Sequence, residues 1–477
     1  MRIRCGTRWG HDHRKERTLL LQNIKKIHFV GIGGSGMSGI AKVMLAMGFD
    51  VSGSDISKAE TIYKLEKLGA TIYIGHAAEN VADAQAIVLS TAISESNPEV
   101  SAARQRGLMV FHRADLLAYI MKSKQGIAVA GAHGKTTTTS MIAVMLEKCG
   151  TDPTILIGGE LPYLNGNAKL GQGSWVVAEA DESDGTFLKL SPQIAVVTNI
   201  ENDHLDFYKS MDNILFTFKE FLHKLPIETG VAILCFDNQY LRNIAQNVPG
   251  RVISYGIDYE ADYMARNIRI NGSAMIYDVY FDGQMLGTIT LDVPGRHNVA
   301  NSLAAFAVGH YMGLSFEQIA EGLAAFHGVK RRFQTKGKVK NCWIVDDYAH
   351  HPTEIITTLK AARDLNPTRL ICIFQPHRYS RTSFLKEEFG RAFLAADHLI
   401  LTDVYGAGEE PIAGVTGEVI KDEVERQTSQ KPIYIADKNK ISRYLAEIVE
   451  PGDLIMTMGA GDIYQAGEEL VERLAQG

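Results

Sequence analysis

Two glycine-rich loops, each placed between an apolar strand and a helix, limit what this chain can fold into. The first lies in HFVGIGGSGMSG (28–39) and the second in AGAHGKTTTT (130–139). Loops of this kind form where a parallel strand feeds a helix whose N-terminus binds phosphate. The sequence therefore predicts an α/β protein with two separate nucleotide-type sites.

The first loop has the dinucleotide-binding spacing. Gly31, Gly33 and Gly36 spell G-x-G-x-x-G, and Asp55 follows about twenty residues later, the usual distance to a ribose-binding acid. Taken alone, the loop is typical of a nicotinamide-dependent dehydrogenase. Asp55 is equally well interpreted as a residue that caps the end of a strand.

Composition excludes several classes of protein. The chain has 477 residues, with 49 Lys and Arg against 55 Asp and Glu, and a mildly acidic chain is a poor binder of nucleic acid. Its five cysteines form no C-x-x-C pair, which favours reduced cytoplasmic thiols over disulfides or a zinc site. No apolar run reaches the roughly 20 residues of a membrane helix, so we expect no membrane insertion.

Strand-like apolar segments alternate with helical patterns along the chain, and the pattern predicts three α/β units. We expect residues 1–24, which are basic and aperiodic, to form a disordered extension. Residues 251–293 are interpreted as short antiparallel strands with a DG turn, followed by a helix capped near Asn298. The predicted domains are 25–122, 123–331 and 332–477.

The second loop determines the class of reaction. Gly131 and Gly134 let the backbone approach phosphate, Lys135 can reach the β- and γ-phosphates, and Thr136 can place its hydroxyl on Mg²⁺. The standard pattern has a glycine where Val129 stands, so the match is incomplete. The strand before the loop and the helix after it still favour ATP binding.

Acidic segments follow two strands of the same unit. Glu179 lies just past the apolar stretch WVVA, and His204 lies in ENDHLD among acidic residues. Together with Thr136 they could hold Mg²⁺ between protein and phosphates, although histidine is an unusual magnesium ligand. A dehydrogenase has no need of this second site, whereas an ATP-driven enzyme acting on a nucleotide-linked substrate uses both loops.

Ten motifs in order resemble the Mur ligase family over residues 25–477. Besides the two glycine loops they are STAI, EADESDGTF, TNIENDHLDFY, GRHNVANSLAA, GVKRRFQ, DDYAHHPTE, FQPHRYSRT and MGAGDIY. The resemblance implies three domains: an N-terminal Rossmann-like domain, a central P-loop ATPase-like domain with a mixed sheet, and a C-terminal Rossmann-like domain.

The resemblance is strongest to the branch that joins L-alanine to the carboxylate of UDP-N-acetylmuramate, with ATP and Mg²⁺, in peptidoglycan precursor synthesis. It implies a cytoplasmic enzyme, monomeric or weakly dimeric, that acts on small molecules. In this family the first glycine loop receives the uridine diphosphate and nicotinamide is absent. A sister ligase that attaches recycled tripeptide shares most of the motifs and stays the alternative. A non-enzymatic ATP-binding switch is a further reading.

The resemblance also implies which residues form each site. Lys135, Glu179 and His204 are the expected catalytic residues, and Thr136, Glu179 and His204 the expected metal ligands. The expected ATP site is Gly131, Ala132, His133, Gly134, Lys135, Thr136, Thr137, His297, Asn298 and Arg332. The UDP-substrate site is Gly31, Gly33, Gly34, Gly36, Ser90 and Thr91, and the amino-acid site is Tyr348, His377, Arg378 and Arg381.

The arginines of FQPHRYSRT are expected on a loop beyond a strand, where their guanidinium groups can bind a carboxylate bidentately.

Some Mur ligases carry a carbamylated lysine near the second magnesium. Lys219 lies about where that lysine falls in relatives, and we expect it to be an unmodified surface residue.

Overall fold

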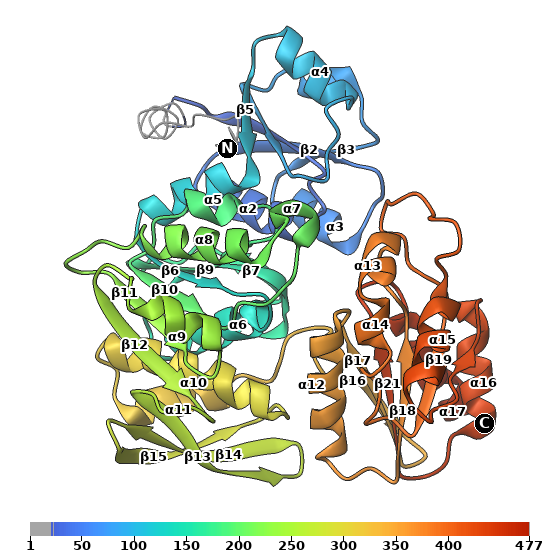
Figure 1. Cartoon of the computed structure of the whole chain (residues 1–477). Coiled ribbons are helices and arrows are strands. Elements are labelled where there is room, and N and C mark those ends of the chain that lie inside the picture. Colours follow the sequence, from blue (N-terminus) through green and yellow to red (C-terminus); the bar gives the residue numbers. More distant parts are fainter. Residues whose placement is uncertain (1–20, 22, 477) are drawn as a thin grey trace, which may run out of the picture.

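The computed structural model describes residue 21 and residues 23–476, which form three α/β units, each built on its own sheet (Figure 1). The first unit lies at the top of the view, the central unit below it, and the C-terminal unit to one side. The predicted α/β class with three domains is confirmed. No helix in the described part of the chain is long and apolar enough to cross a membrane.

The first sheet is fully parallel, with strand order β3-β2-β1-β4-β5. Because the order reverses between β1 and β4, the loop after β1 opens at a topological switch point, where such folds bind ligands. The elements are β1 (Lys26–Val30), α2 (Ser35–Ala46), β2 (Asp50–Asp55), α3 (Glu60–Lys67), β3 (Thr71–Ile74), η1 (Ala78–Val81), β4 (Ala86–Leu89), α4 (Pro98–Gln105), β5 (Met109–His112) and α5 (Arg113–Lys122).

The central sheet is mixed and has the order β15-β14-β13-β12-β11-β10-β6-β9-β7-β8. Strand β6 lies inside it and ends at the second glycine loop. The elements up to β11 are β6 (Gln125–Ala130), α6 (Lys135–Lys148), β7 (Thr154–Leu161), η2 (Pro162–Leu164), β8 (Gly166–Lys169), β9 (Trp175–Glu179), η3 (Thr186–Lys189), β10 (Ile194–Val197), α7 (Leu205–Tyr208), α8 (Met211–Leu222) and β11 (Val231–Cys235). Those that follow are α9 (Gln239–Ala245), β12 (Arg251–Gly256), β13 (Tyr263–Asn271), β14 (Ala274–Phe281), β15 (Gln284–Leu291), α10 (Arg296–Tyr311) and α11 (Phe316–Ala324).

The C-terminal sheet has the order β16-β17-β21-β18-β19-β20 and is parallel except for β16. Its elements are β16 (Gln334–Val339), β17 (Cys342–Asp347), α12 (Pro352–Arg363), β18 (Arg369–Phe374), α13 (Tyr379–Phe384), α14 (Lys386–Phe389), β19 (His398–Leu401), α15 (Gly417–Gln427), β20 (Ile433–Tyr434), η4 (Lys438–Lys440), α16 (Ile441–Ile448), β21 (Asp453–Met458) and α17 (Tyr464–Gln476).

The first and central units share one hydrophobic cluster, which includes Phe29 and Ile40 of the first and Val129 and Phe218 of the second. The C-terminal sheet has separate clusters on its two faces, because neighbouring side chains of a strand point to opposite sides. The C-terminal unit is therefore joined to the rest through the segment 329–333 and through polar contacts rather than through a shared core.

Three expectations from the sequence need correction. Strand β12 is parallel to β11, because it returns through the crossover helix α9, so only β13–β15 form the antiparallel part. Helix α10 begins at Arg296, so Asn298 lies within its first turn. The extension 1–24 lies mostly outside the described residues, but Leu21 and Ile24 pack into the core, and the packed chain therefore begins before residue 25.

A buried carboxylate holds the first unit together. Glu99 is fully buried and accepts hydrogen bonds from Ser54 Oγ at 2.6 Å and from Asn80 Nδ2 at 2.6 Å, and it lies 3.0 Å from His76 Nδ1. Burial alone would raise its pKa, but hydrogen bonds with His28, Ser54, Asn80 and His76 outweigh that effect and lower the pKa to about 2. The ionised form therefore favours the fold.

Glu99→Gln should lower the free energy of unfolding at pH 7 by about 2–3 kcal/mol, since hydrogen bonds to a charged group are lost. The folded pKa of about 2 lies below the ordinary value of 4.5, so the contribution is complete above pH 4.5 and disappears as the pH falls toward 2. Urea unfolding at several pH values measures this, with the exposed Glu79→Gln as control. A gap between the two variants that does not shrink in acid would contradict the assignment.

Candidate active site

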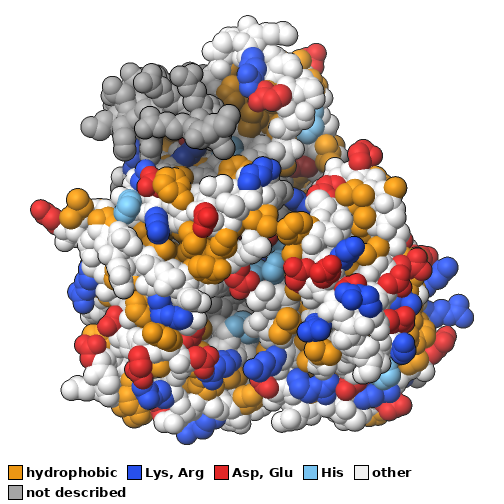
Figure 2. All heavy atoms as spheres, viewed as in Figure 1, with side chains coloured by type: hydrophobic (Ala, Val, Ile, Leu, Met, Phe, Trp, Pro, Cys, Tyr) orange, Lys and Arg blue, Asp and Glu red, His pale blue; other side chains and the backbone are white. Residues whose placement is uncertain are grey.

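The three units meet at one cavity of about 870 Å³. Figure 2 shows a hollow between the central and C-terminal units, with acidic and histidine side chains along it. The cavity brings together many of the residues predicted from the sequence. They are Thr91 from the first unit; Ala132, His133, Gly134, Lys135, Thr136, Glu179 and His204 from the central unit; and Arg332, Tyr348, His377, Arg378 and Arg381 from the hinge and the C-terminal unit.

The loop after β6 has the shape that a phosphate-binding loop needs. Gly131 and Gly134 have φ angles of +134° and +83°, in the region that favours glycine. A Cβ at Gly131 would lie 2.2 Å from Thr198 Oγ1, and one at Gly134 would lie 2.7 Å from Asn301 Oδ1. Both glycines are therefore required by backbone shape and by close packing, and helix α6 starts directly behind them.

Lys135 lies at the centre of the cavity. Its Nζ donates to the carbonyl oxygens of Gly131 at 2.6 Å and Ala132 at 3.2 Å, and to Glu182 Oε1 at 2.7 Å. Burial alone would lower the pKa of Lys135, but the carboxylates of Glu182, Glu179 and Asp181 raise it above its ordinary value. The lysine is therefore charged, and its ammonium group is held by the P-loop carbonyl oxygens and by Glu182.

Thr136 and Glu179, two of the predicted metal ligands, are hydrogen-bonded to each other. Thr136 Oγ1 donates to Glu179 Oε1 at 3.0 Å, and Glu179 Oε2 accepts from the backbone nitrogen of Gly158 at 2.7 Å. A hydroxyl and a carboxylate are oxygen donors of the kind that Mg²⁺ prefers. His204 lines the same cavity, with Nε2 3.6 Å from Glu182 Oε1 and 3.5 Å from Asp203 Oδ2.

Asp55 supports the first glycine loop through a hydrogen bond. Its Oδ2 accepts from the backbone nitrogen of Gly33 at 2.9 Å. Gly31 has φ +75°, and its backbone nitrogen donates to Ser54 O at 2.8 Å. Of the other predicted residues, Gly34 caps the start of α2, Gly36 lies in its first turn against Arg113, and Ser90 follows β4 beside Thr91. Asp55 therefore serves the loop itself. The described cavity lining from the first unit is Ser35, Thr91 and Ala92, so the predicted glycines of this loop and Ser90 do not line this cavity.

A smaller cavity of about 200 Å³ continues from the P-loop between α10 and α12. Thr137, His297, Asn298 and Arg332 line it, as predicted for a nucleotide, together with His133 and Gly134. Burial, with the nearby charge of Arg332, lowers the pKa of His297 to about 4, so this histidine is neutral. A neutral imidazole and an amide suit the edge of a base better than a phosphate.

The residues predicted to bind the amino-acid substrate lie at the carboxyl edge of the C-terminal sheet. Strand β18 ends at Phe374, and His377 and Arg378 follow on the loop, but Arg381 lies in α13 rather than on the loop as expected. Arg381 Nη1 lies 3.2 Å from His377 Nδ1. Burial and the neighbouring cations lower the pKa of His377 to about 3, so it is a neutral partner there.

Sequence reasoning missed several groups. Glu182, only 4% exposed, is the partner of Lys135, and its place three residues after Glu179 was the available signal. Arg331, at φ +62°, donates to the carbonyl oxygens of Gly459 and Gly461 and to Asp346, which ties the hinge to the C-terminal sheet. Glu354 contacts the P-loop from α12, and no local pattern indicates that contact.

Lys135→Met should destabilise the folded protein by about 3 kcal/mol, because it leaves the buried carboxylate of Glu182 without its cation. Adding Glu182→Gln should restore most of this loss, since both charges are then gone. Thermal or urea unfolding of the two variants and the wild type measures the difference. Equal stability of Lys135→Met and the wild type would show that the Lys135–Glu182 ion pair does not contribute to the free energy of unfolding.

Comparisons with known proteins agree along the whole chain. Three family models match: the Mur ligase family catalytic domain at residues 26–125, the Mur ligase middle domain at 129–309, and the Mur ligase glutamate ligase domain at 331–461. A UDP-N-acetylmuramate–L-alanine ligase of Pelotomaculum thermopropionicum is 53% identical over 453 residues, covering 95% of this chain and 98% of the relative. One from Geotalea uraniireducens is 53% identical, covering 94% and 98%.

Solved structures show the same arrangement. A UDP-N-acetylmuramate-alanine ligase from Thermotoga maritima superposes with a TM-score of 0.81 at 29% identity, covering 94% of this chain and 99% of that one. A murein peptide ligase from Psychrobacter arcticus gives a TM-score of 0.71 at 27% identity, covering 95% and 99%. With three matching domain models in order and relatives 53% identical over almost its full length, the chain belongs to the Mur ligase family.

Proposed function

We propose that this protein is an ATP-dependent ligase that joins L-alanine to the carboxylate of UDP-N-acetylmuramate in peptidoglycan precursor synthesis. The observation that carries the proposal is the single cavity of about 870 Å³ lined from all three units. It places Ser35 and Thr91 of the first unit, the P-loop lysine and a pair of arginines around one space, which suits a three-substrate reaction. Relatives 53% identical bear the corresponding name.

The chemistry follows from the reactivity of the groups. A carboxylate is a poor acyl donor, so its oxygen first attacks the γ-phosphorus of ATP, and the bond to the β-γ bridging oxygen breaks to release ADP. The amine of alanine then attacks the acyl phosphate, loses a proton, and phosphate leaves with the former carboxylate oxygen. Lys135 stabilises the charge on the transferred phosphoryl group, the kind of fixed interaction that is worth roughly 10²–10³ in rate.

Magnesium is part of the proposal, and the donor set fits it. Thr136 Oγ1 and Glu179 Oε1, 3.0 Å apart, would hold the ion on the side of the P-loop that faces the phosphates. When bound, the ion would neutralise charge on the β- and γ-phosphates. His204 is the weaker candidate ligand, because Mg²⁺ prefers oxygen.

Glu179→Gln should shift activity to higher Mg²⁺ concentration, because a neutral amide binds the ion more weakly than a carboxylate. His204→Ala should shift it less. Phosphate release titrated with Mg²⁺ at saturating ATP measures both variants, with the exposed Glu228→Gln as control. An unchanged titration for either variant would remove that residue from the metal site.

The amino acid is proposed to bind between Tyr348, His377, Arg378 and Arg381, all of which line the cavity. Arg378 has φ +70°, and its backbone nitrogen donates to Tyr405 O at 2.8 Å. This conformation fixes where its side chain leaves the loop. Two guanidinium groups can then hold the alanine carboxylate while its amine faces the acyl phosphate.

Arg378→Lys should raise the KM for L-alanine by about tenfold to a hundredfold, because lysine keeps the charge but loses the planar fork. The kcat should also fall, since the amine is positioned less well. The KM values for ATP and UDP-N-acetylmuramate should stay nearly unchanged in steady-state assays. A rise in the ATP KM instead would assign the arginine to phosphate.

The function is tested by phosphate release from ATP and UDP-N-acetylmuramate, screened over the twenty amino acids and the recycled murein tripeptide. Alanine should give the highest kcat/KM. A clear preference for the tripeptide would favour the sister ligase, and NADH binding at the first loop would favour a dehydrogenase. Release that needs no amino acid, or none at all, would contradict a ligase.

Several further expectations belong to the proposal. The domain boundaries at residues 25, 123 and 332, a cytoplasmic location beside ATP and UDP-linked precursors, and a monomeric or weakly dimeric state are proposed with the function. Lys219 lies in α8, is partly exposed and is absent from the described lining of the cavity. We propose that it is unmodified, so bicarbonate or short carboxylic acids should not rescue Lys219→Ala.

A further inference from the structure

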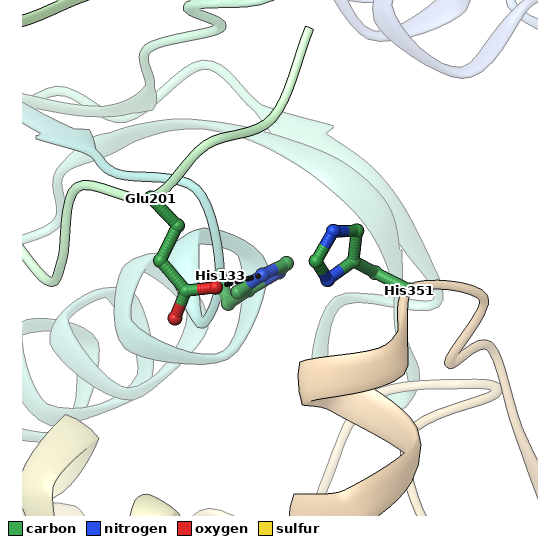
Figure 3. A group of neighbouring side chains, drawn as sticks. All are labelled: His133, Glu201 and His351. Atoms are coloured by element: carbon green, nitrogen blue, oxygen red, sulfur yellow. Dashed lines mark ion pairs between the residues drawn. The ribbon is translucent and has the colours of Figure 1, made fainter. Parts of the chain in front are cut away.

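One histidine of the P-loop faces carboxylates from two different units. His133 Nε2 lies 3.3 Å from Glu201 Oε2, in the segment after β10, and His133 Nδ1 lies 3.2 Å from Glu354 Oε1, on α12. Figure 3 shows His133 between Glu201 and the start of α12, with His351 beside it. The contact with Glu354 spans 221 residues of sequence and crosses from the central to the C-terminal unit.

His133, Glu201 and His351 have ligand atoms within 4.8 Å of one another, close enough to hold a metal ion. The contacts of His133 argue against this use. Its Nδ1 is hydrogen-bonded to Glu354, and its Nε2, which has no hydrogen-bond partner among the described residues, lies 3.3 Å from Glu201 Oε2. Two flanking carboxylates favour the doubly protonated imidazole, which has no lone pair for a metal. Burial alone would lower the pKa of His133, but Glu201 and Glu354 raise it to about 10.

The partner histidine is also unsuited to a metal. His351 Nδ1 accepts from the backbone nitrogen of Thr353 at 3.4 Å, where it caps the start of α12. A neutral imidazole that accepts at Nδ1 carries its proton at Nε2. Burial and the charge of His133 lower the pKa of His351, which keeps it neutral. The cluster is therefore a cation between two acids.

Other contacts tie the same groups together. Thr353 Oγ1 donates to Glu201 Oε2 at 3.0 Å, which is a second bridge between the units. The backbone nitrogen of His350 donates to Glu354 Oε2 at 3.0 Å, and Arg332 Nη1 lies 3.8 Å from Glu354 Oε1. The hydrophobic clusters of the C-terminal unit are separate from the cluster that contains the P-loop strand. The position of this unit against the P-loop therefore depends on these polar contacts.

We propose that His133 is a positioning residue: as an imidazolium between Glu201 and Glu354, it docks the start of α12 on the P-loop. The docked segment carries Tyr348 and His350, so the contact sets the distance between the amino-acid site and Lys135. Its single positive charge also offsets part of the negative charge of two carboxylates that line the nucleotide cavity and that would otherwise repel phosphate more strongly. The proposal rests on the assignment of that cavity to ATP.

The test is a double-mutant cycle on His133→Asn and Glu354→Gln, measured as the Kd for ATP alone and as the radius of gyration in small-angle scattering. Glutamine preserves the capping role of Glu354 while removing its charge. His133→Asn, which leaves both carboxylates beside the nucleotide cavity without this cation, should weaken ATP binding by about tenfold or more. Each single variant should expand the protein, and the double variant should expand it little beyond one single variant.

The matched control is His327→Asn, which removes an exposed ion pair with Asp292 and should leave both readouts at wild-type values. A Kd of His133→Asn for ATP within twofold of this control would overturn the proposal. So would effects of the two substitutions on the radius of gyration that add in the double variant. Zn²⁺ titrated into the nucleotide-free enzyme tests the metal reading. If the enzyme binds Zn²⁺ tightly and stoichiometrically, and this binding disappears in His351→Asn, the proposal that His133 is a positioning residue would also be overturned. The Kd for ATP and the radius of gyration are measured without alanine ligation. Failure of this proposal can therefore be distinguished from failure of the proposed ligase reaction.

Discussion

The charge of Lys135 is the interaction on which the rest of the site depends. The lysine lies where the P-loop and Glu182 meet, and the nearby carboxylates of Glu182, Glu179 and Asp181 raise its pKa. Without a phosphate, loop carbonyl oxygens and Glu182 satisfy its ammonium group. A phosphate would offer the same group another anion in place of Glu182. The site is therefore prepared for ATP without leaving a buried charge unpaired.

The way the units are joined fits a reaction with three substrates. The first and central units share a hydrophobic cluster, and Arg113 of α5 also pairs with Asp181 at 2.6 Å. The C-terminal unit is joined by the hinge at Arg331 and by polar contacts such as that of His133 with Glu354. Polar interfaces open and close more readily than a shared core. A polar joint of this kind lets the C-terminal unit move relative to the other two more easily than a shared core would.

Local patterns in the sequence predicted what local physics determines. The glycine loops, the strand ahead of each loop and the helix behind it follow from apolar spacing and from backbone shape at Gly131 and Gly134. Strand β12 was misassigned because alternation alone does not show which neighbour a strand pairs with. The helical position of Arg381 was missed because α13 is short and polar.

Contacts between segments far apart in the sequence could not be predicted from local patterns, for a different reason. His133 and Glu354 come together only because two sheets present their carboxyl edges to one cavity. Glu182 becomes the partner of Lys135 only because the chain after β9 passes back over the P-loop. In each case the energy lies in an ion pair set by the tertiary fold. The position of Glu182 three residues after Glu179 is the one signal in the sequence, and no local pattern indicates the contact of Glu354.

The central claim is that the substrate carboxylate is activated by phosphoryl transfer in this cavity. UDP-N-acetylmuramate labelled with ¹⁸O in both carboxylate oxygens tests it directly, with mass spectrometry of the phosphate released during turnover with ATP and L-alanine. The account predicts one ¹⁸O atom in each phosphate and one in the new amide. Phosphate without label, formed while the amide-linked product accumulates, would contradict it.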